Sequence, residues 1–212
     1  MKHKEGRVAE DPSPLIESAG GLGIDLDGNQ AQALLSFERM LIERAIPLGM
    51  VASGDRTAIR ERHVLDSLRA VLAVEPSDVD SFDLGSGAGL PGIVVSIARP
   101  SLHVGLVEPR RRRAAFLEFA VERLKLPNAA VLASPADRVE AVVDVCFARA
   151  LSGLTGAWEL ARPLLRPGGR LVYFGGRGFL EPDQLPPEAS SIGQLRTPAL
   201  ATSGPLVIMT RQ

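Results

Sequence analysis

The chain has 212 residues, 45% of them hydrophobic and 23% charged, with a formal net charge of −1. These values suit one soluble globular domain of ordinary to large size and exclude a protein that is basic over its whole surface. No apolar run approaches the roughly 18–20 residues of a membrane-spanning helix, and the polar N-terminus lacks an apolar signal sequence. A single cysteine, Cys146, excludes an internal disulfide and a cysteine-cluster zinc site. We therefore expect a cytoplasmic protein with no metal site and no membrane contact.

The first third of the chain is predicted to be helical after a loose start. Residues 1–28 are rich in Pro, Gly, Asp and Glu and are expected to form a loose N-terminal arm with a short helix near residues 15–19. Residues 30–46 and 57–74 place apolar side chains on one face at helical spacing. Residues 29–75 are therefore expected to form a small helical extension.

After Pro76 short apolar runs alternate with helical segments. Strands are expected at residues 79–84, 103–107, 129–133, 142–147 and 170–174, and helices at 90–98, 111–124 and 155–165. This alternation predicts an α/β domain, residues 76–212, with a parallel sheet and helices on both faces. Residues 192–196 and 206–210 are joined by a link too short for a crossover helix, so they are expected to form a final antiparallel pair.

A glycine-rich loop, "DLGSGAGLPGIVVSIARP" (residues 83–100), follows the first expected strand and opens a helix. In this context glycines permit a tight turn and let the backbone approach a ligand. The spacing of Gly87, Gly89 and Gly92 matches the dinucleotide fingerprint G-x-G-x-x-G. The spacing of Asp83, Gly85, Gly87 and Gly89 matches the first motif of class I methyltransferases, which bind S-adenosylmethionine.

Three features favour the methyltransferase interpretation. The carboxylate of Asp83 could receive an ammonium group or organise the loop, but it would repel a pyrophosphate. Pro91 removes a backbone donor that a phosphate would use. The segment "LLRPGGRLVYFGG" (residues 164–176) is similar to the region that follows the catalytic segment in class I methyltransferases.

Other candidate cofactor residues follow the next strands. Glu108 stands 19 positions after Gly89, where either nucleotide interpretation predicts a carboxylate for ribose hydroxyls. Ala136 and Asp137 follow the third strand, where such enzymes hold adenine, and Arg149 follows the fourth at the ligand-binding edge of the sheet. Cys146 lies in an apolar strand and is interpreted as a small core residue.

Four consecutive arginines begin the second helix of the α/β domain: Arg110, Arg111, Arg112 and Arg113. Together with Arg62 and Arg177 they are the candidate phosphate contacts for RNA. His63 is a candidate base or ligand contact.

Several of these stretches together resemble the glucose-inhibited division protein B family, the small-subunit ribosomal RNA methyltransferase G enzymes. The similarity spans about residues 62–176 and rests on "RHVLDSL", the glycine loop with its "GLPG", "EPRRRRAAFLE" and "ARA". It implies a Rossmann-like seven-stranded class I methyltransferase sheet whose last strand is antiparallel. It also implies methyl transfer from S-adenosylmethionine to N7 of a guanine in 16S ribosomal RNA.

The resemblance also implies residue roles. The family's cofactor positions match Gly85, Leu90, Ala136, Asp137 and Arg149, with Glu108 as the ribose acid, and its upstream motif matches Arg62, His63, Asp66 and Ser67. We take Arg149, His63 and Asp66 as the catalytic candidates. The implied partner is 16S ribosomal RNA, free or in an assembling small subunit, and the protein is expected to be a monomer.

The chain departs from the family pattern at two places. "GMVASGD" (residues 49–55) stands where the family has an Asn-Leu-Thr stretch, and Gly175 stands where it has a lysine at the end of the fifth strand. Three alternatives stay open: a methyltransferase for another RNA or a small molecule, a nicotinamide-dependent oxidoreductase, and a non-catalytic cofactor- or RNA-binding protein.

Overall fold

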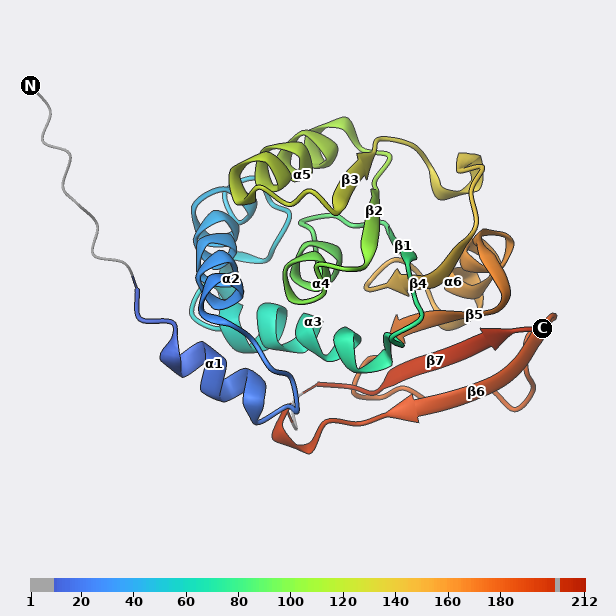
Figure 1. Cartoon of the computed structure of the whole chain (residues 1–212). Coiled ribbons are helices and arrows are strands. Elements are labelled where there is room, and N and C mark those ends of the chain that lie inside the picture. The colour runs from blue at the N-terminus through green and yellow to red at the C-terminus, as the bar shows by residue number, and fades with distance from the viewer. Residues whose placement is uncertain (1–9, 201–202) are drawn as a thin grey trace, which may run out of the picture.

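The computed structural model describes residues 10–200 and 203–212. Its centre is a seven-stranded sheet in the order β3-β2-β1-β4-β5-β7-β6 (Figure 1). The strands are β1 Asp80–Leu84, β2 His103–Val107, β3 Ala129–Leu132, β4 Val143–Ala148, β5 Leu165–Phe174, β6 Ala189–Leu195 and β7 Leu206–Arg211. The first five are parallel, whereas β7 pairs antiparallel with both β5 and β6. The Rossmann-like order with an antiparallel last strand is as expected.

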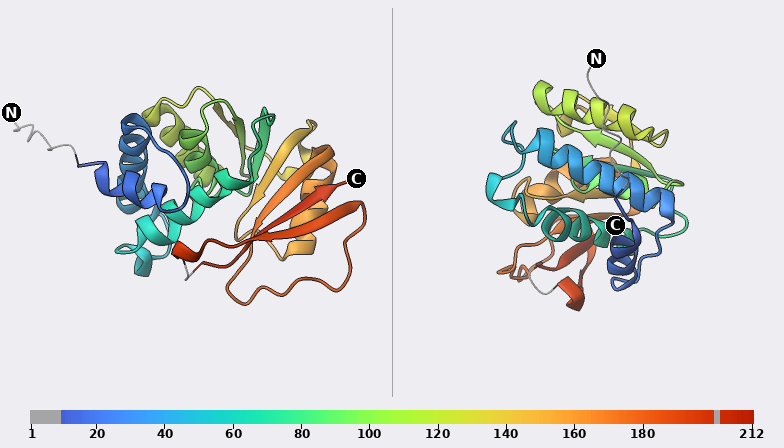
Figure 2. Two further views of the ribbon diagram at one scale, coloured as in Figure 1. Left: turned by 60° about the horizontal axis from the view of Figure 1, so that its bottom comes forward. Right: turned by 90° about the vertical axis from the view of Figure 1, so that its left-hand side faces the viewer.

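Helices cover both faces of the sheet (Figure 2). One face carries α1 Ser13–Gly20, α2 Gly28–Met40, α4 Gly92–Ala98 and α5 Arg111–Leu124, with the continuous turns of η3 Arg60–Leu65, α3 Asp66–Leu68 and η4 Arg69–Ala73. The other face carries α6 Leu154–Ala161 and η6 Arg162–Leu164. Each face buries its own apolar cluster, because side chains alternate between the two faces of a strand.

A capping box at the start of α2 also connects this helix to α4. Asp27 and Gln30 form a reciprocal capping box at the start of α2, with bonds of 2.8 and 2.9 Å. The Gln30 amide also donates to the carbonyl oxygen of Ile97 at 3.1 Å, at the end of α4. The first helix of the extension is thereby fixed to the helix that follows the glycine loop.

The expected loose arm is wrong for the described residues from Ser13 onward. The short helix near residues 15–19 is present as α1, but its Leu15 and Ala19 are fully buried. Leu22, Ile24 and Leu26 are also buried in the same cluster as the α/β core. Pro and Gly content suggested a loop, but apolar residues at regular spacing gave this segment enough buried surface to pack. Residues 1–9 of the arm lie outside the described residues.

The boundary expected at residue 76 stays a prediction. One apolar cluster joins side chains from both sides of it, among them Leu34 of α2 and Ile93 of α4. Strand β5 begins earlier than the strand expected at residues 170–174 and takes in residues 167–169, where the register with β4 shifts and Gly168 has φ +80°. No helix in the described part of the chain is long and apolar enough to cross a membrane.

Candidate functional site

The glycine loop forms a sharp turn between β1 and α4, at the carboxyl edge of the sheet. Gly85, Gly87 and Gly89 have φ of +70°, +57° and +86°, a region that side chains rarely adopt. A Cβ on Gly85 would stand 2.6 Å from Leu151 Cδ1, and one on Gly89 would stand 2.5 Å from Ile93 Cδ1. The positive φ angles therefore favour glycine at all three positions, and the atoms that a Cβ would meet at Gly85 and Gly89 are ends of the Leu151 and Ile93 side chains.

The carboxylate of Asp83 organises this turn from inside. It is 1% exposed, and its Oδ2 accepts hydrogen bonds from Ser86 Oγ at 2.7 Å and the Gly92 backbone N–H at 2.9 Å. Its Oδ1 is buried and has no hydrogen-bond partner among the described residues. Burial raises the pKa of Asp83 to about 6, against the lowering effect of the Ser86 and Gly92 hydrogen bonds.

Glu108 supports the same loop from the end of β2. It is 2% exposed; its Oε2 accepts from the Gly87 N–H at 3.0 Å and its Oε1 from the Arg110 N–H at 2.9 Å. Arg113 Nη1 lies 3.9 Å from Oε2. Each carboxylate oxygen can accept a further hydrogen bond. Glu108, the carboxylate predicted to bind ribose hydroxyls, therefore lies against the glycine loop, and its oxygens can each accept one more hydrogen bond.

The arrangement disagrees with a dinucleotide pyrophosphate site. Such a site uses free N–H groups at the start of the following helix. Here the Gly92 N–H already donates to Asp83, and a Cβ on Gly92 would stand 2.6 Å from Asp83 Oδ2. A pyrophosphate at this helix start would meet a carboxylate.

A cleft of about 300 Å³ opens beside the loop. It is lined by Gly85, Ser86, Gly87, Ala88 and Leu90 of the loop and by Met50, Val51, Ala52, His63, Arg113, Arg149 and Ala150. The departure from the family's Asn-Leu-Thr stretch therefore falls on a wall of this cleft. Ala136 and Asp137 do not line it; they lie on the short turn η5 Ala136–Arg138, where Asp137 is exposed.

His63 and Arg149 meet at the side of the cleft. His63 Nε2 lies 2.9 Å from Asp55 Oδ2, and its Nδ1 lies 3.5 Å from Arg149 Nη2. Burial lowers the pKa of His63, although Asp55 opposes this. With Nε2–H donating to Asp55, Nδ1 of the neutral ring faces the guanidinium as an acceptor. Asp55, which the sequence did not single out, thus sets the ring orientation.

Arg149 is held from the extension by a buried chain of ion pairs. Its Nη2 lies 3.0 Å from Asp66 Oδ2 and donates to the carbonyl oxygen of Arg62 at 2.7 Å. Asp66 Oδ1 in turn accepts from Arg69 Nη2 at 2.5 Å, and Arg69 Nη1 donates to Gly204 O at 2.9 Å. Arg69, 2% exposed, was also missed, because a lone arginine on an apolar helix carries no motif.

A second hollow of about 690 Å³ adjoins the cleft and shares Arg149 and Ala150 with it. Tyr173, Phe174, Gly175, Gly176 and Arg177 line it from the end of β5, and Arg62, Asp66 and Arg69 line it from the extension. A Cβ on Gly175 would stand 3.0 Å from Pro205 O and 3.2 Å from Phe179 Cβ. Close packing thus accompanies glycine at the position where the family has lysine.

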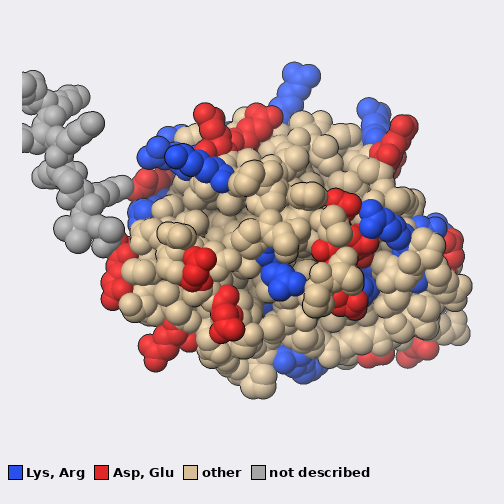
Figure 3. Space-filling model, viewed as in Figure 1, with Lys and Arg blue, Asp and Glu red and all other residues tan. Residues whose placement is uncertain are grey.

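The predicted RNA-binding arginines differ in their exposure and in their partners. Arg110, Arg111 and Arg112 are exposed at the start of α5, whereas Arg113 turns into the cleft. Arg62 forms an ion pair with Asp55, and Arg177 is exposed at the rim of the second hollow. Figure 3 shows acidic and basic side chains interspersed on one face of the molecule.

Cys146 is fully buried in β4, and burial raises the pKa of its thiol. A thiol held in its neutral form is a poor nucleophile. The interpretation of Cys146 as a core residue agrees with this placement. No cluster of residues that could hold a metal ion is found among the described residues.

Replacement of Asp83 by Asn tests whether the raised pKa of this carboxyl group makes the stability of the protein depend on pH. Because the pKa of Asp83 is about 6 in the folded state against an ordinary value of 3.8, the folded state keeps a proton that the unfolded state has lost. The free energy of unfolding of the wild type should therefore fall as pH rises from about 4 to about 6, by up to about 3 kcal/mol. Asp83→Asn should lack this decline in urea denaturation across that range.

Asp137→Asn, which removes an exposed carboxylate, is the matched control and should keep the wild-type profile. An identical pH profile for Asp83→Asn and the wild type would contradict the raised pKa.

Comparisons with known proteins agree with this geometry. The family model described as rRNA small subunit methyltransferase G matches residues 30–186. A protein of that name from Xanthomonas oryzae pv. oryzae is 35% identical over 98% of this chain and 99% of its own length, and one from Acidiphilium cryptum is 38% identical over 68% of each. A SAM-dependent methyltransferase structure from Aquifex aeolicus shares the fold, with a TM-score of 0.52 and 16% identity over 78% of this chain and 97% of its own. The chain therefore belongs to the rRNA small subunit methyltransferase G family.

Proposed function

We propose that the protein transfers a methyl group from S-adenosylmethionine to N7 of a guanine in 16S ribosomal RNA. Family membership gives the reaction class, methylation of small-subunit ribosomal RNA. The observation that carries the proposal is the pair of adjoining hollows that share Arg149: one beside the glycine loop for the cofactor, one beside β5 for the base.

The residues beside the loop fit the cofactor. The buried Asp83 Oδ1 lacks a partner and can accept from an N–H donor, and Glu108 keeps acceptor capacity for ribose hydroxyls. Gly85 and Gly87 leave their backbone uncovered, and Leu90 supplies an apolar wall. When bound, S-adenosylmethionine supplies an electrophilic methyl group. Ala136 and Asp137 remain the proposed adenine contacts, reached past the end of β3.

The acceptor atom requires no general base. Guanine N7 carries a lone pair and no proton, so the protein must align the base and exclude water. The absence of a required base agrees with the contacts of His63, because both ring nitrogens of the neutral side chain face protein partners, Asp55 and Arg149. We assign His63 and Asp66 the role of positioning Arg149, which faces both hollows, rather than that of moving a proton.

Contacts with the RNA are assigned to the exposed arginines. Arg110, Arg111 and Arg112 lie at the start of α5 on the cleft side, with Arg113 inside the cleft, and Arg62 and Arg177 border the acceptor hollow. We propose that a monomer works on 16S ribosomal RNA, free or in an assembling subunit, in the cytoplasm. The target base must be unstacked to reach the acceptor hollow.

Calorimetric titration with S-adenosylhomocysteine tests the cofactor half. Gly85→Arg should abolish saturable binding, because φ is +70° and Leu151 Cδ1 lies 2.6 Å from the Cβ position. Gly193→Arg is the matched control, since no atom of the described residues lies within 4 Å of its Cβ position on β6. NAD should give no signal. Saturable NAD binding would favour the oxidoreductase alternative instead.

Transfer of labelled methyl groups tests the acceptor half. Naked 16S ribosomal RNA and assembled small subunits are incubated with labelled S-adenosylmethionine, and the RNA is digested to nucleosides. We expect the label in 7-methylguanosine. Label in another nucleoside, or transfer only to other RNAs, would contradict the assigned acceptor; cofactor binding without any transfer would favour the non-catalytic alternative.

A further inference from the structure

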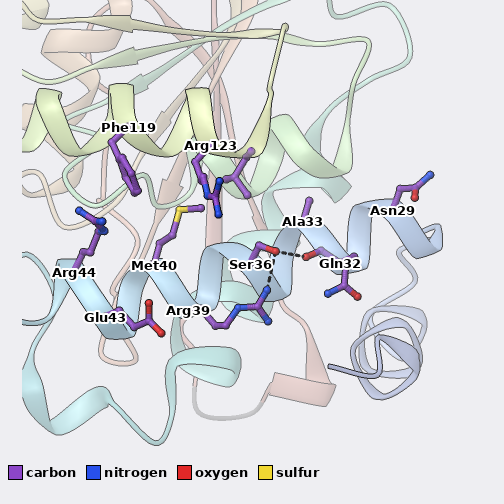
Figure 4. A pocket seen from close by; sticks show the side chains of 11 residues that line it. Asn29, Gln32, Ala33, Ser36, Arg39, Met40, Glu43, Arg44, Phe119 and Arg123 are labelled. Atoms are coloured by element: carbon purple, nitrogen blue, oxygen red, sulfur yellow. Dashed lines mark hydrogen bonds between the residues drawn. The ribbon is translucent and has the colours of Figure 1, made fainter. Parts of the chain in front are cut away.

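A polar groove between α2 and α5 lies outside the cofactor cleft and the acceptor hollow. Its volume is about 550 Å³. Figure 4 shows Phe119 and Arg123 pointing into it from α5, Met40 from the end of α2, and Arg44 from the turn that follows α2, η1 Leu41–Ala45. Three arginines and one glutamate, Arg39, Arg44, Arg123 and Glu43, are the charged residues of its lining. The groove is thus cationic on a chain whose net charge is −1.

Two of these arginines contact an aromatic ring or a hydroxyl group. The Arg44 guanidinium lies over the Phe119 ring, with Cζ 4.1 Å from the ring centroid. Arg39 donates to Ser36 Oγ at 3.0 Å, and Ser36 in turn donates to Gln32 O at 2.9 Å. Arg39 also pairs with Glu10 at 3.6 Å. Among the described residues, no ion pair joins Arg44 or Arg123 to a carboxylate.

The chemistry of the groove fits phosphates rather than bases. One face of the Arg44 guanidinium is covered by Phe119, which leaves its N–H edge for the two-point contact that suits a phosphate. The same contact occupies the Phe119 face on which a base would stack. Such a surface suits a ligand with a regular row of anions and no fixed base sequence.

Its position connects the groove to the proposed reaction. Arg113 lines the cofactor cleft, and Phe119 and Arg123 follow on the same helix, about 9 and 15 Å further along its axis. We propose that the groove binds the sugar-phosphate backbone of the RNA that flanks the target nucleotide, with Arg44 and Arg123 on its phosphates. This inference rests on the proposed function for the identity of the RNA.

The double variant Arg44→Gln/Arg123→Gln tests the proposal. Both side chains are exposed, so folding should be unaffected. Binding of fluorescently labelled 16S ribosomal RNA fragments is measured by anisotropy over a range of salt concentrations. The slope of log affinity against log salt should become shallower by about 1.5, since each lost phosphate contact contributes about 0.7–0.9. Affinity should fall about tenfold or more at low salt, equally for fragments of different sequence, while S-adenosylhomocysteine affinity stays unchanged.

Arg138→Gln/Arg162→Gln is the matched control, because it removes two arginines from η5 and η6, away from the groove. It should leave the slope unchanged. Phe119→Leu removes only the stacking and should weaken binding without changing the slope.

Equal slopes for the groove variant, the control and the wild type would overturn the proposal, as would a wild type that binds no RNA. Failure of the proposed function looks different: the wild type would bind RNA with a groove-dependent slope yet transfer no methyl group to it.

Discussion

The site depends on two buried carboxylates that hold the backbone of one glycine turn. β1 and β2 are neighbouring parallel strands with Leu84 paired to Val107, so Asp83 and Glu108 reach the same edge of the sheet. Their oxygens accept the N–H groups of Gly92 and Gly87 at 2.9 and 3.0 Å. Burying a carboxylate is costly unless it is hydrogen-bonded, and the raised pKa of Asp83 shows that its hydrogen bonds offset this cost only in part. Asp83 Oδ1 is left without a hydrogen-bond partner among the described residues.

The helical extension is part of the site. Arg69 joins Asp66 of the extension to Gly204 before β7, and Asp66 joins Arg149 after β4. Three segments far apart in the chain thus fix one guanidinium between the two hollows. Removing one member of a buried ion-pair chain leaves an uncompensated charge. The orientation of Arg149 therefore depends on Asp66 and Arg69 of the extension. The packing of α1 and α2 on the same core keeps this extension in place.

The sequence predicted the sheet, its alternation with helices and the glycine turn because these follow from periodicity and from backbone needs that only glycine meets. It did not predict the packed segment around Leu15, since composition alone suggested a loop. Asp55 and Arg69 were missed because their importance comes from partners distant in the chain or from burial, which no local motif encodes. The placement of Ala136 and Asp137 outside the cleft likewise depends on the path of the connection between β3 and β4.

A crystal structure of the protein with S-adenosylhomocysteine tests the central claim most directly. The account predicts the ligand beside the glycine turn, with its amino-acid end near Asp83 and its ribose hydroxyls on Glu108. Saturating ligand found elsewhere, such as the apolar groove of about 840 Å³ that Phe82 and Val143 help to line, would contradict it.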